Sequence, residues 1–308
     1  MNDLHTLRPI DALAESGSLL NRRLWLVLLP IGIDLLIWFG PRIMLGAELL
    51  PLAEGSPSTL EAGASPESAN IFTIVSQSNL LSLILGIWVP SLGVAVSGEG
   101  PGATIVLDSF QQFLLALVLL LPVSFLLGGT YLALIAAEVQ QSALPWEVLL
   151  PRVLRLTNRL GGLVGVMLVA TLVPFAVASL MLSLVPLIGA LLLLLAVALL
   201  LWVAFYVFFI VDSVALVRQS LPKVIRLTLD VIHANLWSSV GFFFLYWLIV
   251  FGTSILWGPI LGWEILSISI GRIIATIGNA YVGTWVTIAL FMYVWNRLLI
   301  HRGDPSSA

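Results

Sequence analysis

Residues 186–212 read PLIGALLLLLAVALLLWVAFYVFFIVD, and the only charged residue in this stretch is the last one, Asp212. As a helix, a run of this length is long enough to cross a hydrocarbon core of about 30 Å, which takes about 20 residues. Similar runs occur at 24–45, 112–137, 160–183, 236–257 and 273–296. Overall, 60% of the residues are hydrophobic and 9% are charged, whereas roughly a quarter are charged in soluble domains. The sequence therefore predicts an all-α, polytopic integral membrane protein with six transmembrane helices, forming a single membrane domain over 1–308.

Basic residues indicate the orientation, because Lys and Arg near helix ends are retained on the cytoplasmic side. With six crossings and the amino terminus inside, only Arg42 and Arg272 of the 13 basic residues lie outside. We therefore expect a multi-pass protein of the cytoplasmic (plasma) membrane with both termini cytoplasmic. There is a seventh apolar run at 79–97. If it crossed the membrane, the orientation of every later segment would be inverted. We expect it to be a re-entrant or interfacial element within an external region, 46–111.

A short motif is repeated within the chain. Residues 150–157, LPRVLRLT, recur 71 positions later as LPKVIRLT at 221–228. Each copy has a Pro suited to a first helical turn, and as a helix each places an apolar stripe beside a basic one, as helices in a membrane interface do. We therefore expect 150–159 and 221–232 to be equivalent in-plane amphipathic helices on the cytoplasmic face, within repeats 112–183 and 183–254. The amino-terminal segment 1–23 has a similar position ahead of the first span.

The cations of the two copies are candidates for binding anionic lipid headgroups or a protein partner: Arg152, Arg155, Arg159, Lys223 and Arg226. The alternative is that they only anchor the topology, as basic residues beside spans commonly do.

The second half of the chain resembles a group of bacterial six-helix membrane proteins, similar to the membrane domain found ahead of some glycerophosphodiester phosphodiesterases. The resemblance covers roughly 110–260 and rests on FFIVD at 208–212, RQSLPKV at 218–224 and WSSVG at 237–241. It implies a six-helix membrane domain. Nothing resembling a phosphodiesterase catalytic domain is attached, and the group provides no catalytic residues to carry over.

Asp34 is the one acidic residue deep inside a predicted span. An ionisable group near mid-bilayer is costly and usually faces protein or water, so Asp34 is expected to face the interior. The last span supplies the candidate polar neighbours Asn279, Tyr281 and Thr284. Ion or proton movement and structural pairing both remain open for this candidate intramembrane polar site. Two other carboxylates, Glu138 and Asp212, lie near helix ends, where we expect them to pair with the nearby cations.

Glycines in the predicted spans have two interpretations. Gly161-x-x-x-Gly165, Gly128-Gly129 and the pair Gly278 and Gly283 are compatible with a transport path through broken or closely approaching helices. Small residues in membrane helices more often permit close packing between helices.

The sequence disfavours an enzyme. It has no cysteine, and its three histidines do not share a helix at metal-ligand spacing, so we expect no metal, cofactor or catalytic residue. The net charge of −3 gives no reason to expect nucleic acid as a partner. We expect a non-enzymatic scaffold, assembly or lipid-organising subunit, with membrane lipids and membrane-protein subunits as partners. The alternative is a small transporter or permease subunit that uses Asp34.

Overall fold

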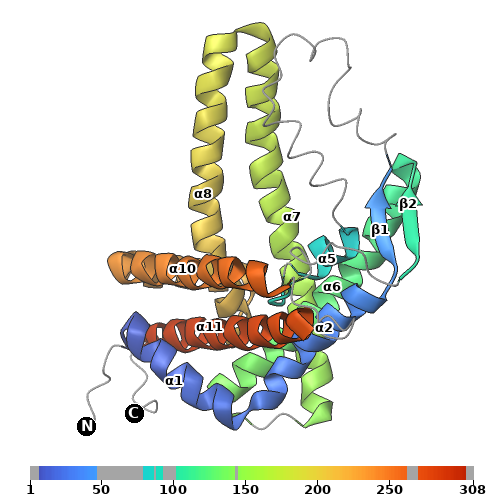
Figure 1. The fold of residues 1–308 in the computed structure, drawn as a ribbon. Helices are drawn as coiled ribbons and strands as arrows, with labels where there is room; N and C mark the ends of the chain where they lie inside the picture. The colour runs from blue at the N-terminus through green and yellow to red at the C-terminus, as the bar shows by residue number, and fades with distance from the viewer. Residues whose placement is uncertain are drawn as a thin grey trace. The chain divides into compact units, whose positions relative to one another are not determined.

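A computed structural model of the chain describes residues 7–46, 79–86, 88–92, 102–142, 145–261 and 270–302. Helices make up almost all of this part, which confirms the predicted helical class (Figure 1). The elements are α1 (Pro9–Arg22), the 3-10 helix η1 (Leu24–Val27), α2 (Leu28–Phe39), β1 (Arg42–Leu45), α5 (Leu80–Leu85), β2 (Thr104–Leu107), α6 (Phe110–Val139), α7 (Trp146–Leu184), α8 (Pro186–Leu216), α9 (Leu221–Ala234), α10 (Leu236–Leu261) and α11 (Ile270–Arg302).

Five of these helices, α6, α7, α8, α10 and α11, are long and apolar enough to cross a membrane. They coincide with the last five of the predicted spans. Large apolar side chains cover their outward surfaces; Leu172, Leu187 and Leu194, for example, are 63%, 75% and 69% exposed. A continuous apolar surface of this size is unfavourable in water. The helices are therefore compatible with a multi-pass membrane protein.

The first predicted span is shorter than expected. The helical part runs from Leu24 to Phe39, and the chain is extended from Gly40 into β1, so the expected helix over 24–45 is wrong in its last six residues. Pro41 explains the difference. A proline disfavours helical backbone angles in the residue before it, and Gly40 accordingly has φ −75° and ψ 176°.

The two copies of the repeated motif do not form equivalent helices. Residues 150–159 are part of the continuous helix α7, whereas 221–232 lie in the separate helix α9. Asn235 ends α9, because its side-chain amide donates to the Val231 carbonyl oxygen at 3.0 Å and competes with the helical backbone. The corresponding position after the first copy, 71 residues before Asn235, is Val164. Its apolar side chain cannot form such a bond to the backbone, and α7 continues through this point.

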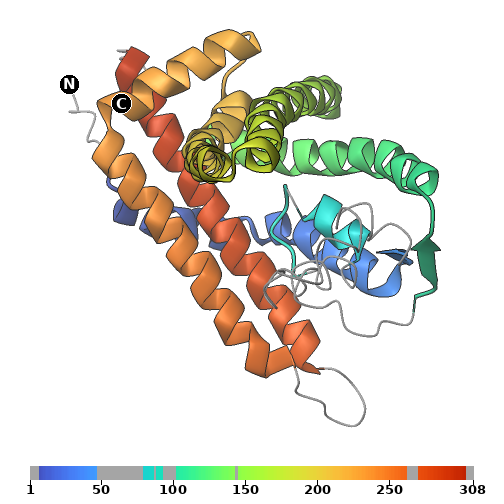
Figure 2. The ribbon, with the colours of Figure 1, turned by 90° about the horizontal axis from the view of Figure 1, so that it is seen from above.

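Contacts between residues divide the chain into two compact units. The α7–α8 unit comprises Met1–Leu19, Leu132–Trp247 and Val286–Ala308, and the α5 unit comprises Leu20–Tyr131 and Leu248–Trp285. Four helices, α1, α6, α10 and α11, run through both units. Within each unit α10 lies beside α11 (Figure 2). Phe242 stacks on Tyr293 with ring centres 4.9 Å apart, and the Trp257 ring lies against Gly278.

In the α5 unit, a small apolar core joins α5 to the two strands. Leu80, Ile84 and Leu107 are buried, and apolar residues of β1 and α6 pack against them. The strands β1 and β2 are parallel, with Arg42 opposite Thr104. Asn79 joins these elements, since its Oδ1 accepts from the backbone N–H groups of both Leu81 and Ile43 at 3.1 Å. With six residues, α5 is too short to cross a bilayer. Residues 93–97 of the predicted re-entrant element and most of the external region lie outside the described residues.

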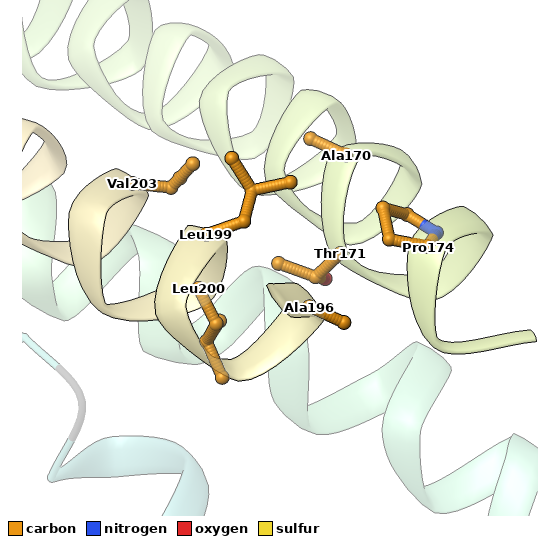
Figure 3. A pocket seen from close by; sticks show the side chains of 7 residues that line it. All are labelled: Ala170, Thr171, Pro174, Ala196, Leu199, Leu200 and Val203. Atoms are coloured by element: carbon orange, nitrogen blue, oxygen red, sulfur yellow. The ribbon is translucent and has the colours of Figure 1, made fainter. Parts of the chain in front are cut away.

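In the α7–α8 unit, α7 and α8 form an antiparallel helical hairpin (Figure 1). Gly189 of α8 lies directly against the Leu182 backbone of α7, close to the tip of the hairpin. A shallow groove lies between the two helices; it is lined by Ala170, Thr171, Pro174, Ala196, Leu199, Leu200 and Val203 (Figure 3). The lining is apolar except for Thr171, whose hydroxyl donates to the Met167 carbonyl oxygen at 2.9 Å. The one polar side chain of the lining is thus bonded within its own helix, and the groove is a packing feature of the hairpin.

Candidate functional site

Side chains from α7 and from the end of α6 hold the carboxyl-terminal end of α8. The last carbonyl groups of a helix have no partner within the helix and carry partial negative charge, so guanidinium and amide donors stabilise them. The hydrogen bonds here are Arg152 Nη2 to Gln140 Oε1 (3.0 Å) and to the Ala215 carbonyl oxygen (3.4 Å), Gln140 Nε2 to the Leu216 carbonyl oxygen (2.8 Å), and Arg159 Nη1 to the Val217 carbonyl oxygen (2.9 Å).

Arg152 and Arg159 are thus half-buried structural residues. The sequence indicated both as candidates for binding lipid headgroups or a partner. It did not predict that they hold the end of α8. Their spacing of seven residues puts them on one face of α7, two turns apart. That spacing was visible in the sequence, but their backbone acceptors on another helix were not.

The other cations at this end of the unit face away from the protein. Arg155, Arg218, Lys223 and Arg226 are all exposed. Arg218 lies close enough to Arg152, and Arg155 close enough to Arg159, for their like charges to repel. We call Arg152, Arg155, Arg159, Arg218, Lys223 and Arg226 the basic end. No member of the basic end forms an ion pair with any residue that the structure describes.

Helix α9 contributes an amphipathic surface to the basic end. Val224, Thr228 and Val231 are buried on one face, whereas Lys223 and Arg226 are exposed on another. Of the apolar stripe predicted for this segment, Val224 and Val231 are buried and Leu227 is half-buried. The structure therefore brings the cations of both motif copies to the end of α8, although only the second copy is a separate helix.

Asp34 lies in the interior of the α5 unit, with 6% of its surface exposed. Its Oδ1 accepts a hydrogen bond of 3.0 Å from the backbone N–H of Leu92, in the segment that follows α5. The donor of this bond is a backbone group 58 residues along the chain, not one of the polar side chains named for the last span. This bond ties α2 to the segment 88–92.

The other predicted members of this site have partners of their own. The Tyr131 hydroxyl of α6 donates to Thr284 Oγ1 at 3.1 Å, and the Tyr281 hydroxyl donates to Asn21 Oδ1 at 2.8 Å. Asn279 is half-buried and makes no hydrogen bond with the described residues. Three of the four residues proposed as one polar site, Asp34, Tyr281 and Thr284, thus have hydrogen-bond partners outside that set. This arrangement resembles structural pairing more than a shared ion site.

Three of the glycines have neighbours that explain them as packing positions in the α5 unit. The Trp88 side chain lies against Gly128 of α6, Pro90 lies against Gly283 of α11, and Trp257 lies against Gly278. A side chain at any of these positions would overlap the neighbour. By contrast, a methyl group on Gly161 or Gly165 would have no neighbour within 4 Å.

Asp212 is buried near the end of α8, with 3% of its surface exposed. The expected pairing with a nearby cation is wrong: no ion pair or hydrogen bond joins Asp212 to any residue that the structure describes, and its Oδ2 is buried without a donor. The arginines of α7, Arg152 and Arg159, instead donate to backbone carbonyl groups that follow Asp212 in the chain. Sequence reasoning missed this residue as a candidate site, because position near a helix end is a poor guide to burial.

A polar network joins the amino-terminal segment to the ends of α10 and α11. The Leu7 backbone N–H donates to Asn296 Oδ1 at 3.0 Å, and Arg297 Nη2 donates to the Leu7 carbonyl oxygen at 3.3 Å. The same guanidinium reaches Ser238 Oγ at 3.4 Å and lies over the Tyr293 ring at 5.3 Å. Residue 7, the start of α10 and the end of α11 therefore meet in one place.

Neither a family model, nor a curated protein, nor a solved structure matches the chain.

Proposed function

We propose that the chain is a non-enzymatic, multi-pass protein of the cytoplasmic membrane that organises anionic lipids through its basic end. The observation that carries this proposal is the gathering of six cations without an ion pair among the described residues. Like charges gathered without an ion pair repel one another, and anions from outside the chain relieve that repulsion. Phosphate groups of anionic lipids supply such anions where a basic surface adjoins apolar helices.

The position of the basic end along the helices supports lipid as the source of these anions. In α7 the last cation, Arg159, directly precedes the apolar run that starts at Leu160, and in α8 the apolar run ends just before Arg218. A cation at such a boundary lies at headgroup depth when the apolar run lies in the hydrocarbon core. Exposed Lys223 and Arg226 extend the same surface along α9.

Six crossings, with both termini on the cytoplasmic side, fit this proposal. The bonds from Leu7 to Asn296 and Arg297 support placing the amino-terminal segment and the end of α11 on one membrane face. An even number of crossings must then lie between them, whereas the long apolar helices number five. The shorter Leu24–Phe39 segment is the sixth crossing in this proposal. That count puts the basic end on the same face as Arg22 and Arg23, in agreement with charge retention.

The topology is testable because the native chain has no cysteine. Ser109 and Ser220 are both exposed and lie at opposite ends of the proposed spans. In intact cells, an impermeant thiol reagent is expected to label Ser109→Cys and to leave Ser220→Cys unlabelled until the membrane is permeabilised. Labelling of Ser220→Cys in intact cells would place the basic end outside and refute the proposed function.

Lipid preference is the direct test of function. The variant Arg155→Gln/Lys223→Gln/Arg226→Gln removes three exposed cations and no hydrogen bond to the α8 carbonyl groups. Each basic residue near an anionic surface contributes about 1 kcal/mol, so the preference for phosphatidylglycerol over phosphatidylcholine is expected to fall roughly a hundredfold. The measurement is a titration of the delipidated protein in detergent with each lipid, monitored by tryptophan fluorescence.

The matched control is Arg152→Gln/Arg159→Gln, which changes two cations that hold the end of α8. It is expected to lower the free energy of unfolding by about 1–3 kcal/mol, because backbone carbonyl groups lose charged donors. The triple variant is expected to unfold like the native protein. An unchanged lipid preference in the folded triple variant would leave topological anchoring as the role of these cations.

A small transporter or permease subunit is the second candidate, and Asp34 is the observation that favours it. A carboxyl group buried within an apolar helix marks ion and proton pathways in many membrane proteins. Against this candidate, the Oδ1 of Asp34 is engaged by the Leu92 backbone in a contact that also explains a structural role.

A further inference from the structure

We propose that Asp212 is a proton-binding site: a carboxylic acid that stays neutral inside the folded α7–α8 unit and releases its proton only when its surroundings open. This site is separate from the basic end and does not depend on the proposed lipid function. It rests on the burial of Asp212, on the side chains that surround it and on its missing hydrogen-bond partner.

Aromatic rings line this part of α8. Phe208, one turn before Asp212, packs edge to face on Tyr246 of α10 with ring centres 4.7 Å apart, and on Phe243 at 5.2 Å. Phe209 is 1% exposed and lies 6.4 Å from the Tyr293 ring of α11. Asp212 itself is 3% exposed, and no described residue donates a hydrogen bond to its carboxyl group.

The titratable groups on the surrounding helices do not neutralise a carboxylate at this position. On α7, Arg152 and Arg159 donate to the backbone carbonyl groups that follow Asp212. On α9, His233 is hydrogen-bonded to Tyr206 at 3.0 Å. On α11, the Tyr293 hydroxyl contacts Ser238 and Ser239.

On α10, the Tyr246 hydroxyl lies within electrostatic range of Asp212 and carries no positive charge. The guanidinium of Arg297 on α11 is directed to Ser238 and Leu7.

An ionised carboxylate without a cation or a hydrogen-bond donor costs several kcal/mol in such surroundings. A bound proton removes that cost, so the folded state holds the acid in its neutral form. The unfolded chain, by contrast, releases this proton above about pH 4. Because the folded state binds one more proton than the unfolded state, rising pH favours unfolding.

A purely structural role makes a different prediction. A carboxyl group retained for packing would have a hydrogen-bond partner, as Asp34 does, and its replacement by an apolar residue would be harmful. For Asp212, replacement by Leu removes a buried polar group without a partner, and this is expected to be neutral or stabilising. Asp212 therefore lowers the stability of the α7–α8 unit. A residue that is kept despite this cost is consistent with a site for proton binding.

The test compares the full chain with Asp212→Asn in detergent, measuring unfolding between about pH 5 and about pH 9. The folded-to-unfolded ratio of the native chain is expected to fall relative to that of the variant, by up to tenfold per pH unit, until Asp212 ionises in the folded state. Other titrating groups are shared by both proteins and cancel in this comparison. Asp212→Glu keeps an acid at this position and is expected to retain the native pH dependence.

Infrared spectroscopy of the folded protein at neutral pH gives an independent measurement. The carbonyl band of a protonated carboxylic acid is expected in the native chain and is expected to be weaker in Asp212→Asn. If Asp212→Asn fails to fold, Asp212→Leu serves in the same comparison. Equal pH dependence of unfolding in the native chain and the variant, or equal acid bands in both, would overturn the proposal.

Discussion

Gly128→Ala and Gly283→Ala are each expected to lower the free energy of unfolding by about 1–3 kcal/mol, because inserted carbon overlaps atoms that cannot easily move. At Gly128 the new methyl group meets Cβ and Cγ of Trp88, next to the backbone of that residue. At Gly283 it meets the rigid ring of Pro90. Both substitutions displace the segment 88–92, whose Leu92 N–H donates to Asp34. In the double variant Gly128→Ala/Gly283→Ala, the losses in free energy of unfolding are therefore not expected to be additive.

The same substitution at two other glycines provides the control. Gly161→Ala and Gly165→Ala introduce a methyl group with no neighbour within 4 Å. Alanine has the higher helix propensity, so each is expected to stabilise α7 by up to about 1 kcal/mol. The free energy of unfolding of all four variants is measured in mixed micelles with increasing amounts of a denaturing detergent. Equal effects at all four positions would contradict the close packing of 88–90 against α6 and α11.

Hydropathy predicted the long helices well. A backbone segment in hydrocarbon must form its hydrogen bonds within itself, and a helix does so. Because this requirement concerns one segment at a time, the sequence alone predicts α6, α7, α8, α10 and α11. The end of α2 was also visible in principle, since Pro41 follows Gly40 at the point where the helix stops. An apolar run marks a span only where no such breaker interrupts it.

The repeated motif misled the prediction for a related reason. Eight similar residues have similar local preferences, but helix boundaries depend on the residues that follow them. Asn235 ends α9 by bonding to the Val231 carbonyl oxygen, and nothing equivalent follows the first copy. Similar cations accordingly have different roles, since Arg152 bonds to backbone carbonyl groups and Lys223 remains exposed.

The sequence could not predict which backbone groups form hydrogen bonds with these side chains. Every residue but proline carries an N–H donor, so no pattern identifies Leu92 as the donor to Asp34 or the carbonyl of Val217 as the acceptor for Arg159. The side-chain candidates Tyr281 and Thr284 were attractive because they are chemically distinctive. Asp212 shows the converse case, since its burial among rings of α8, α10 and α11 follows only from tertiary packing.

Asp34→Leu is expected to destabilise the protein by about 1–3 kcal/mol, because it removes the acceptor of the buried Leu92 N–H and leaves that donor unsatisfied. Leu92 is 5% exposed, so water cannot readily replace the lost oxygen. Asp34→Asn keeps an Oδ1 acceptor of nearly the same shape, and its unfolding is expected to stay within about 1 kcal/mol of the native value. Unfolding in mixed micelles distinguishes the two variants.

The same pair of variants separates the two candidate functions. A lipid-organising protein is expected to keep its preference for phosphatidylglycerol in Asp34→Asn, because Asp34 belongs to the α5 unit and the basic end to the α7–α8 unit. A transporter that moves protons through Asp34 requires this acid to titrate, so Asp34→Asn would abolish proton flux in proteoliposomes without loss of stability. Flux in the native protein that disappears in a stable Asp34→Asn variant would therefore favour the transporter. Absence of flux in both, with Asp34→Leu alone destabilised, assigns Asp34 to holding the segment 88–92 against α2.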